Sequence, residues 1–325
     1  MKLMLDAEIK SPSKRITYSD NIFLIGSCFT EHIGRRLQEL KFNILQNPNG
    51  ILFDPISVSK SLNSYIEQKQ YKQSDLFFWN ELWQSWDHHS MFSGMIAEEV
   101  INKINECQLK AYEHLKKADW LIITLGSSFS YHLADKDQPV ANCHRAPAQW
   151  FKKHLLGIEE TILTLEKSIE RLQVFNPGLK IIFTISPVRH IRDGVAENNR
   201  SKARLIEAVH CLVEKYEHTF YFPAYELVID VLRDYRFYDI DLVHPNYAAT
   251  EFVFDKFERS FIAEETKEFM EEIKKIRNGY KHKPFQPETR SHKLFLQNTL
   301  EHVKNLQEKL PFLDFSKEIN YFSAR

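Results

Sequence analysis

Two candidate nucleophiles stand side by side near the start of the chain. The run Gly26-Ser27-Cys28-Phe29-Thr30 follows the apolar stretch 22–25 and precedes a segment whose apolar residues have helical spacing. A hydroxyl or thiol at a helix N-terminus lies at the positive end of the helix dipole, which favours negative charge. That position would lower the pKa of a thiol and help to hold an oxyanion. In the plainer interpretation, Ser27 only caps the helix and Cys28 is a small buried residue.

An acid and a histidine form a second candidate pair late in the chain. In the run Asp241-Leu242-Val243-His244-Pro245-Asn246, Asp241 and His244 are three residues apart and can share one turn. The carboxylate can then fix the tautomer of the imidazole and stabilise its charged form, while the ring faces a nucleophile. This spacing is expected about once by chance in a chain with this many histidines, so its position before a helix carries more weight than the spacing itself.

The apolar runs of the chain predict a scaffold for these side chains. Three short runs rich in β-branched residues, 22–25, 120–125 and 180–185, are typical of buried parallel strands, and 42–45 is a weaker fourth. Segments with helical spacing lie between them, which indicates right-handed crossovers and a parallel sheet covered on both faces. Ligands bind such sheets at the carboxyl ends of the strands, where the candidate nucleophiles follow the first run.

The chain divides into a larger α/β part, residues 1–260, and a helical C-terminal extension, residues 261–325. The extension is charged and carries two apolar stripes at helical spacing, joined by an extended stretch at 281–287. We expect both stripes to pack on the α/β part. Alternatively, the stripe around Leu300 forms a homodimer interface.

The composition excludes several classes of protein. Lys plus Arg number 43 and Asp plus Glu number 44, so no field of one sign attracts nucleic acid or an anionic membrane. No apolar run reaches the roughly 18 residues that span a bilayer, and the first residues do not read as a secretory signal. The four cysteines form no C-x-x-C pair, and isolated thiols fit a reducing compartment. We therefore expect a cytoplasmic protein.

Five further side chains are candidate substrate-binding residues. Arg189 and His190 follow the third predicted strand at the same sheet edge, where an Arg can hold a carboxylate or phosphate. His88 and His89 lie in an aromatic stretch that could line a pocket for a sugar ring, and His144 comes from a later polar loop. In the plainer interpretation the arginine pairs with a nearby acid and the histidines are core or surface residues. No pair has a standard metal-ligand spacing, so we expect no metal ion and no cofactor.

Taken together, the motifs resemble a known family. A strand, then G-S-C-F-T and a helix, and later D-x-x-H-P-N, is similar to the SGNH/GDSL hydrolase superfamily, and I-G-S-C-F-T more closely resembles the motif of the GSCFA-domain family. The resemblance covers roughly residues 20–260. It implies a flavodoxin-like three-layer α/β sandwich of SGNH-hydrolase type, with a parallel sheet and the C-terminal helical extension. Further stretches that resemble the family are 47–50, 88–93, 142–144, 186–190 and 221–226.

The resemblance implies roles for individual residues. The superfamily's nucleophile stands two residues after the glycine, which here is Cys28, with Ser27 in place of the usual Asp. A shift of one residue would make Ser27 the nucleophile instead. His244 would be the general base, and Asp241 would orient it. The N–H group of Gly50 would contribute to the oxyanion hole.

The third block of the superfamily, G-x-N-D, is incomplete. The matching stretch, Gly126-Ser127-Ser128-Phe129, lacks the Asn. Ser128 could donate to the oxyanion in its place, as could Asn142 from the following loop. Two functions therefore stay open. The first is an ester hydrolase or acyltransferase that acts on a small or carbohydrate-linked acyl group, and the second is a catalytically silent domain that binds a ligand or protein partner.

Overall fold

Five parallel strands form the central sheet of the computed structural model, which describes residues 5–323. Their order across the sheet is β10-β9-β5-β1-β2. Counted along the chain as the first to fifth strands, they follow the order 2-1-3-4-5, which is the flavodoxin-like arrangement. The predicted parallel sheet is therefore confirmed. The strands are β1 (Asn21–Gly26), β2 (Asn43–Gln46), β5 (Trp120–Leu125), β9 (Lys180–Ile185) and β10 (Thr219–Phe222).

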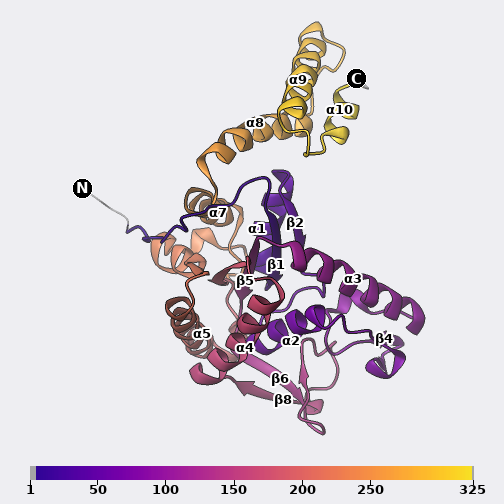
Figure 1. The fold of residues 1–325 in the computed structure, drawn as a ribbon, viewed down its shortest axis with the longest axis vertical. Helices are drawn as coiled ribbons and strands as arrows, with labels where there is room; N and C mark the ends of the chain where they lie inside the picture. The colour runs from indigo at the N-terminus through magenta and orange to yellow at the C-terminus, as the bar shows by residue number, and fades with distance from the viewer. Residues whose placement is uncertain (1–4, 324–325) are drawn as a thin grey trace.

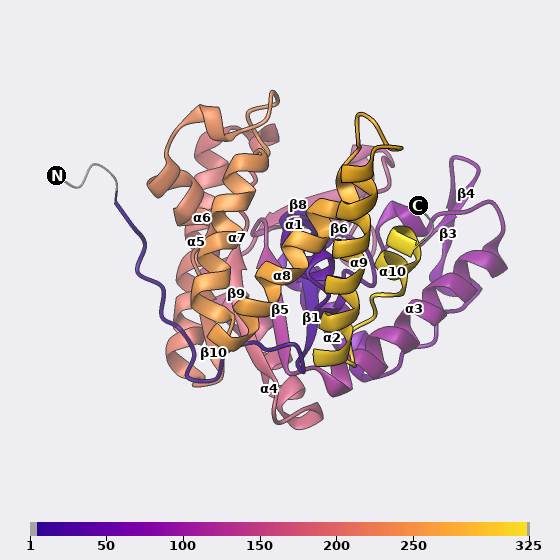
Figure 2. The same ribbon diagram turned by 90° about the horizontal axis from the view of Figure 1, so that it is seen from above.

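Each face of the sheet has its own apolar core. Ile22 and Leu24 of β1 belong to one cluster and Phe23 and Ile25 to another, because successive strand side chains point to opposite faces. Helices cover both faces and complete the three layers (Figures 1 and 2). The first face is covered by α1 (Cys28–Glu39) and α7 (Tyr247–Phe261), and the second by α2 (Pro55–Ile66), α3 (Ala97–Lys117), α4 (Ile158–Phe175) and α5 (Val195–Lys215).

Two small antiparallel sheets lie outside the central one. Residues 129–155 contain the three-stranded sheet β7-β6-β8. Its strands are β6 (Phe129–Leu133), β7 (Pro139–Val140) and β8 (Phe151–Leu155), and the other sheet pairs β3 (Phe77–Trp79) with β4 (Leu82–Gln84). Short helical turns lie at 73–75, 90–92, 148–150, 191–193 and 235–237, and α6 (Ala224–Glu226) runs into a wider turn at 227–232.

The C-terminal extension is a group of three helices that projects from the α/β part (Figure 1). Buried residues of these helices join the apolar cluster of the first sheet face. Ion pairs also tie the extension to the end of α1, with Arg277 to Glu39 at 2.6 Å and Lys41 to Glu318 at 2.8 Å. Leu300 is half-buried against the same cluster. The helices are α8 (Glu264–Lys281), α9 (Arg290–Lys309) and α10 (Ser316–Ser323).

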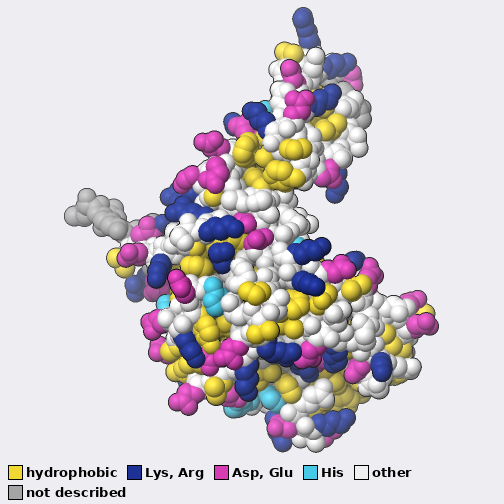
Figure 3. Space-filling view, viewed as in Figure 1, with side chains coloured by type: hydrophobic (Ala, Val, Ile, Leu, Met, Phe, Trp, Pro, Cys, Tyr) yellow, Lys and Arg dark blue, Asp and Glu magenta, His cyan; other side chains and the backbone are white. Residues whose placement is uncertain are grey.

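Charges of both signs are interspersed over the visible surface (Figure 3). This pattern matches the nearly balanced counts of acidic and basic residues. Within residues 5–323, no helix is both long enough and apolar enough to cross a bilayer.

Candidate active site

The turn after β1 depends on Gly26. Its φ is +146°, and a side chain there would place a Cβ 2.2 Å from the carbonyl oxygen of Thr124 on β5. The close approach lets the Ser27 N–H donate to that same oxygen at 3.0 Å, and the Gly26 N–H donates to Asn47 Oδ1 at 2.9 Å. The turn is therefore fixed to β5 and to the loop after β2. It holds both candidate nucleophiles at the carboxyl edge of the sheet.

Ser27 and Cys28 have different surroundings. Ser27 is the N-cap of α1, its side chain is buried, and its Oγ accepts a hydrogen bond from the Phe29 N–H at 3.3 Å. Cys28 is the first residue of α1 and is half-buried against the apolar cluster of the first sheet face. Ser27 thus has the capping role of the plainer interpretation. Cys28 is left free of that role.

The thiol of Cys28 does not have the lowered pKa that its position predicted. Burial raises the pKa of Cys28, and Glu31 in the first turn of α1 raises it further. Lys202 and the N–H groups of Cys28 and Phe29 lower it without outweighing burial. That expectation was therefore wrong, because the free-energy cost of removing the thiolate from water exceeds the stabilisation that the N-terminus of α1 gives it.

Asp241 and His244 form the expected pair. Asp241 Oδ2 lies 2.6 Å from His244 Nδ1, and Asp241 Oδ1 accepts the N–H groups of Val243 at 2.9 Å and His244 at 3.0 Å. These backbone donors, and then the imidazole, lower the pKa of Asp241 to about 2. The carboxylate is therefore ionised at neutral pH. It fixes the orientation of the imidazole, so Nε2 is the ring nitrogen that remains available for proton transfer.

Arg189 holds the loop that carries this pair. Its N–H donates to the carbonyl oxygen of Val243 at 3.2 Å, and its guanidinium donates to that of Leu242 at 3.4 Å. The guanidinium also lies over the rings of Tyr238 and Tyr235, 4.2 Å and 5.0 Å from their centroids. Arg189 therefore attaches the His244 loop to the segment after β9. Its predicted contact with a substrate anion stays a prediction.

His190 lies beside the turn after β1. A Cβ built on Gly126 would be 3.2 Å from His190 Nε2 and 3.3 Å from Ser27 Cβ, so the imidazole and the serine flank the same glycine. The ring also packs on Phe53, with centroids 5.3 Å apart. Burial, and then the charge of Lys202, lowers the pKa of His190 to about 4. The imidazole is therefore neutral at physiological pH.

The three candidate oxyanion donors differ in availability. The Gly50 N–H donates to the carbonyl oxygen of Asn47 at 2.8 Å, so an oxyanion contact would require that turn to open. Ser128 is fully buried, and its hydroxyl lies 3.2 Å from the Ser201 carbonyl and 3.1 Å from the Ser201 hydroxyl on α5. Asn142 accepts the His144 N–H through Oδ1 at 2.8 Å, which leaves its NH₂ group to donate. Asn142 is therefore the most available of the three as a donor.

Asn142 and His190 line the same cavity, whose volume is 440 Å³. It lies between the carboxyl end of β5 and the small sheet β7-β6-β8. Its wall contains aromatic rings, and the Lys153 ammonium lies 3.9 Å from the centroid of the Phe129 ring. Such a mixed aromatic and polar lining suits a small organic ligand.

The other three predicted histidines do not line that cavity. His88 is fully buried with its Nδ1 2.8 Å from Ser85 Oγ, and burial lowers the pKa of His88 to about 3. His144 Nε2 lies 2.8 Å from the carbonyl oxygen of the same serine, and burial lowers the pKa of His144 as well. His89 accepts the Met91 N–H at 3.3 Å. Contact of these rings with a substrate stays a prediction.

Sequence reasoning missed Lys202, a fully buried lysine on α5. Its Nζ donates to the carbonyl oxygens of Gly126 and Ser186, both at 2.6 Å. These carbonyls follow β5 and β9, so the ammonium lies at the edge that carries Cys28. A signal existed, because Lys202 lies in line with the apolar residues Leu205, Val209 and Leu212 of α5, and a charged residue rarely stands in such a buried stripe.

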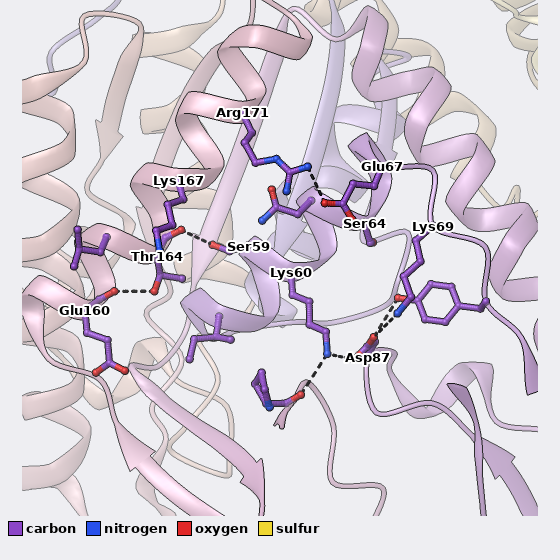
Figure 4. Close-up of a pocket in the computed structure, with 15 residues that line it drawn as sticks. Ser59, Lys60, Ser64, Glu67, Lys69, Asp87, Glu160, Thr164, Lys167 and Arg171 are labelled. Atoms are coloured by element: carbon purple, nitrogen blue, oxygen red, sulfur yellow. Dashed lines mark hydrogen bonds and ion pairs between the residues drawn. The ribbon is translucent and has the colours of Figure 1, made fainter. Parts of the chain in front are cut away.

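A second cavity, of 680 Å³, lies between α2 and α4 (Figure 4). Lys60 pairs with Asp87 at 2.6 Å and Arg171 pairs with Glu67 at 2.8 Å, so much of its charge is already neutralised. None of the predicted site residues lines it. Within the part of the chain that the structure describes, no group of three or more His, Cys, Asp or Glu side chains could hold a metal ion.

The strand order and the helices on both faces of the sheet define a three-layer α/β protein with a flavodoxin-like sheet. A glycine turn follows its first strand, and an Asp–His loop follows its last strand. The model of the GSCFA family matches residues 21–257, and that of the GSCFA domain protein C-terminal domain matches residues 273–325. The chain therefore belongs to the GSCFA family.

The individual proteins to which the chain is similar are distant in sequence. No curated protein matches the chain. Among solved structures, it is similar to a carbohydrate esterase family 3 from Talaromyces cellulolyticus, at 8% identity and a TM-score of 0.37 over 79% of this chain and 99% of that one. It is also similar to an acetyl xylan esterase from the rumen bacterium Butyrivibrio proteoclasticus, at 11% identity and a TM-score of 0.37 over 75% and 65%. At these TM-scores, neither likeness bears on the function of the chain.

Proposed function

We propose that this protein is an ester hydrolase or acyltransferase that acts on a small or carbohydrate-linked acyl group. Cys28 is the nucleophile, His244 the general base and Asp241 the residue that orients it. The observation that carries the proposal is the 2.6 Å contact between Asp241 and His244, because it leaves Nε2 of the ring as the reactive nitrogen. Cys28 supports it by standing at the N-terminus of α1, free of the capping role of Ser27.

In the first half-reaction, Cys28 Sγ bonds to the acyl carbon while the thiol proton moves to His244 Nε2. The tetrahedral intermediate then expels the alkoxide, which takes that proton from His244 and leaves as the alcohol. Water or an acceptor alcohol attacks the resulting thioester and gives its proton to His244. The thiolate leaves, is reprotonated by His244, and the acid or the new ester departs.

The oxyanion is held by the Cys28 N–H and by the Asn142 amide, which supplies the donor that the third block lacks. Asn142 and His190 line the 440 Å³ cavity, which would receive the acyl or sugar group, whereas Cys28 and His244 are not among its lining residues. Arg189 contributes indirectly, because it fastens the loop of His244 to the segment after β9.

One observation favours the rival function, a silent domain that binds a ligand. Burial raises the pKa of Cys28, so the thiol is protonated at neutral pH and cannot attack until a base removes its proton. A domain without catalysis would use the same cavity and would have no need of the Asp241–His244 contact.

Hydrolysis of p-nitrophenyl acetate and butyrate tests the choice. We expect Cys28→Ala and His244→Ala to lose at least a hundredfold in kcat/KM, and Ser27→Ala to lose much less, apart from weakened capping of α1. Cys211→Ala is the matched control, because Cys211 is also a free, half-buried cysteine but lies away from the candidate site. It is nine residues along α5 from Lys202, whose ammonium lies at the carboxyl edge of the sheet, which is about 13.5 Å at 1.5 Å per residue.

Mass-spectrometric mapping of the acyl-enzyme gives the direct answer. A thioester on Cys28 supports the proposal, whereas an ester on Ser27 moves the attack to the serine. If neither residue is acylated and no variant changes turnover, the binding-domain function replaces the enzyme.

A further inference from the structure

Asp54 is a buried acidic residue in the wall of the 440 Å³ cavity. It is 3% exposed, and it lines the cavity together with Asn142. Its Oδ1 accepts the Ser57 N–H at 3.0 Å and so caps the N-terminus of α2. Within residues 5–323, no lysine, arginine or histidine lies within ion-pair distance of Asp54. Its carboxyl group therefore faces the cavity without a cation as partner.

The capping role alone does not require an acidic residue. Ser and Asn cap helices as well as Asp does, and in this chain Ser27 caps α1 and Asn246 caps α7. Burial of an ionised carboxylate is unfavourable unless a cation or several donors replace its lost hydration. Burial raises the pKa of Asp54, because the N–H groups and the Ser57 hydroxyl around it do not compensate fully. The acidic group therefore calls for further hydrogen-bond donors.

The cavity as a whole carries balanced charges. With Asp54 ionised, two acidic and two basic side chains line it, and one of each, Asp193 and Lys153, form an ion pair. The second basic side chain is that of Arg192, and His190 is neutral at physiological pH. The cavity thus favours an uncharged ligand over an anion or a cation.

Hydroxyl groups match the polar atoms of this cavity. A hydroxyl both donates and accepts, whereas an ionised carboxylate only accepts and an NH₂ group only donates. A ligand with several hydroxyls can therefore donate to Asp54 and accept from Asn142, whose NH₂ group is available. The rings of Phe53, Phe129 and Tyr131 provide apolar surface for its C–H groups. A plain alkyl chain would offer Asp54 no donor.

The segment that carries Asp54 is attached to the turn after β1. The Leu52 N–H donates to the Gly26 carbonyl oxygen at 3.1 Å, and the Phe53 carbonyl oxygen accepts the Gly126 N–H at 2.7 Å. Asp54 follows directly. A ligand that contacts Asp54 is therefore held by the segment that joins the ends of β1 and β5, at the sheet edge of the candidate nucleophiles.

We propose that Asp54 accepts hydrogen bonds from the hydroxyl groups of a neutral sugar that binds in the 440 Å³ cavity. The inference rests on the proposed function, because it selects a carbohydrate-linked acyl group over a simple acyl ester as the substrate. Asp54 is then a specificity-determining residue. Sugar binding can nevertheless be measured without any turnover.

Isothermal titration calorimetry with methyl β-D-glucopyranoside, methyl β-D-xylopyranoside and N-acetyl-D-glucosamine tests the proposal. We expect at least one of these sugars to bind, and Asp54→Asn to weaken that binding about tenfold, because hydrogen bonds to a charged acceptor are stronger than those to an amide. Asp54→Asn keeps an oxygen for the Ser57 N–H, so its unfolding midpoint should match that of wild type. Asp234→Asn is the matched control, because exposed Asp234 also caps a helical turn but does not line the cavity.

The outcomes separate this inference from the proposed function. If none of the three sugars binds, or if Asp54→Asn binds them as tightly as wild type, Asp54 only caps α2 and the proposal is wrong. If Asp54→Asn does not fold, the NMR resonance of the Asp54 carboxyl carbon in wild type should shift on addition of the sugar, and an unmoved resonance overturns the proposal. Sugar binding in a protein that hydrolyses no ester supports the inference and removes the proposed function alone. Hydrolysis of p-nitrophenyl butyrate without sugar binding has the opposite meaning.

Discussion

Gly26→Ala should destabilise the protein by about 2–4 kcal/mol. An added Cβ would lie 2.2 Å from the carbonyl oxygen of Thr124 and 2.8 Å from its carbonyl carbon, far inside van der Waals contact with a backbone that cannot rotate away. The φ of +146° adds a strain of roughly 1–3 kcal/mol for a residue with a side chain. Relief by moving the turn away from β5 would break the hydrogen bond from the Ser27 N–H to Thr124, at about 0.5–1.5 kcal/mol.

Urea unfolding followed by circular dichroism measures this difference, read as a lower midpoint at an unchanged slope. Gly178→Ala is the matched control, because the nearest atom to an added Cβ there is 3.8 Å away and its φ is not positive. We expect the control to lie within about 0.5 kcal/mol of wild type, or slightly above it, since Ala restricts the unfolded chain. If Gly26→Ala is as stable as Gly178→Ala, the turn is not fixed by its contact with β5.

Three further outcomes follow from the charges at the sheet edge. Burial lowers the pKa of Lys202 from 10.5 to about 7, so the unfolded chain binds this proton more tightly and the stability that Lys202 contributes falls by up to about 5 kcal/mol as pH drops from 10.5 to 7. The stability of wild type minus that of Lys202→Met should therefore rise with pH in urea unfolding, and a flat difference would contradict the burial of the charge. Asp241→Asn keeps an oxygen for the N–H groups of Val243 and His244 but loses the negative charge, so esterase activity should fall at least tenfold, and full activity in Asp241→Asn would exclude a role for the charge. Arg189→Ala should raise the rate of proteolysis within 239–246, measured by limited digestion, and an unchanged rate would mean that other contacts hold the loop.

The fold could be predicted because its signals are local. The apolar runs 22–25, 120–125 and 180–185 lie within β1, β5 and β9, since a strand buried on both faces needs consecutive apolar residues. The pairing of Asp241 with His244 was equally accessible, because three residues are enough for both side chains to meet in one turn.

Features that depend on several distant segments were not accessible. The pKa of Cys28 is set by how deeply α1 packs on the sheet, and no residue near position 28 in the sequence reports that depth. The Gly50 N–H donates to a carbonyl oxygen within its own turn, and the Ser128 hydroxyl is hydrogen-bonded to Ser201. These bonds form because buried polar groups in the loops after β2 and β5 need partners within the protein. Lys202 was overlooked although its place in an apolar stripe marked it.

The charges at the carboxyl edge favour an event that brings or creates one negative charge. His190 is neutral there, whereas the Lys202 ammonium is buried with only carbonyl oxygens as partners. In a medium that solvates ions poorly, a neutral ion pair is less costly than a single buried ion. Under the proposed function, the oxyanion that forms during acyl transfer would supply that charge, and an anionic ligand would supply it in a silent binding domain. Both candidate functions therefore make the same use of Lys202, and they differ in whether the anion forms by reaction or arrives already charged.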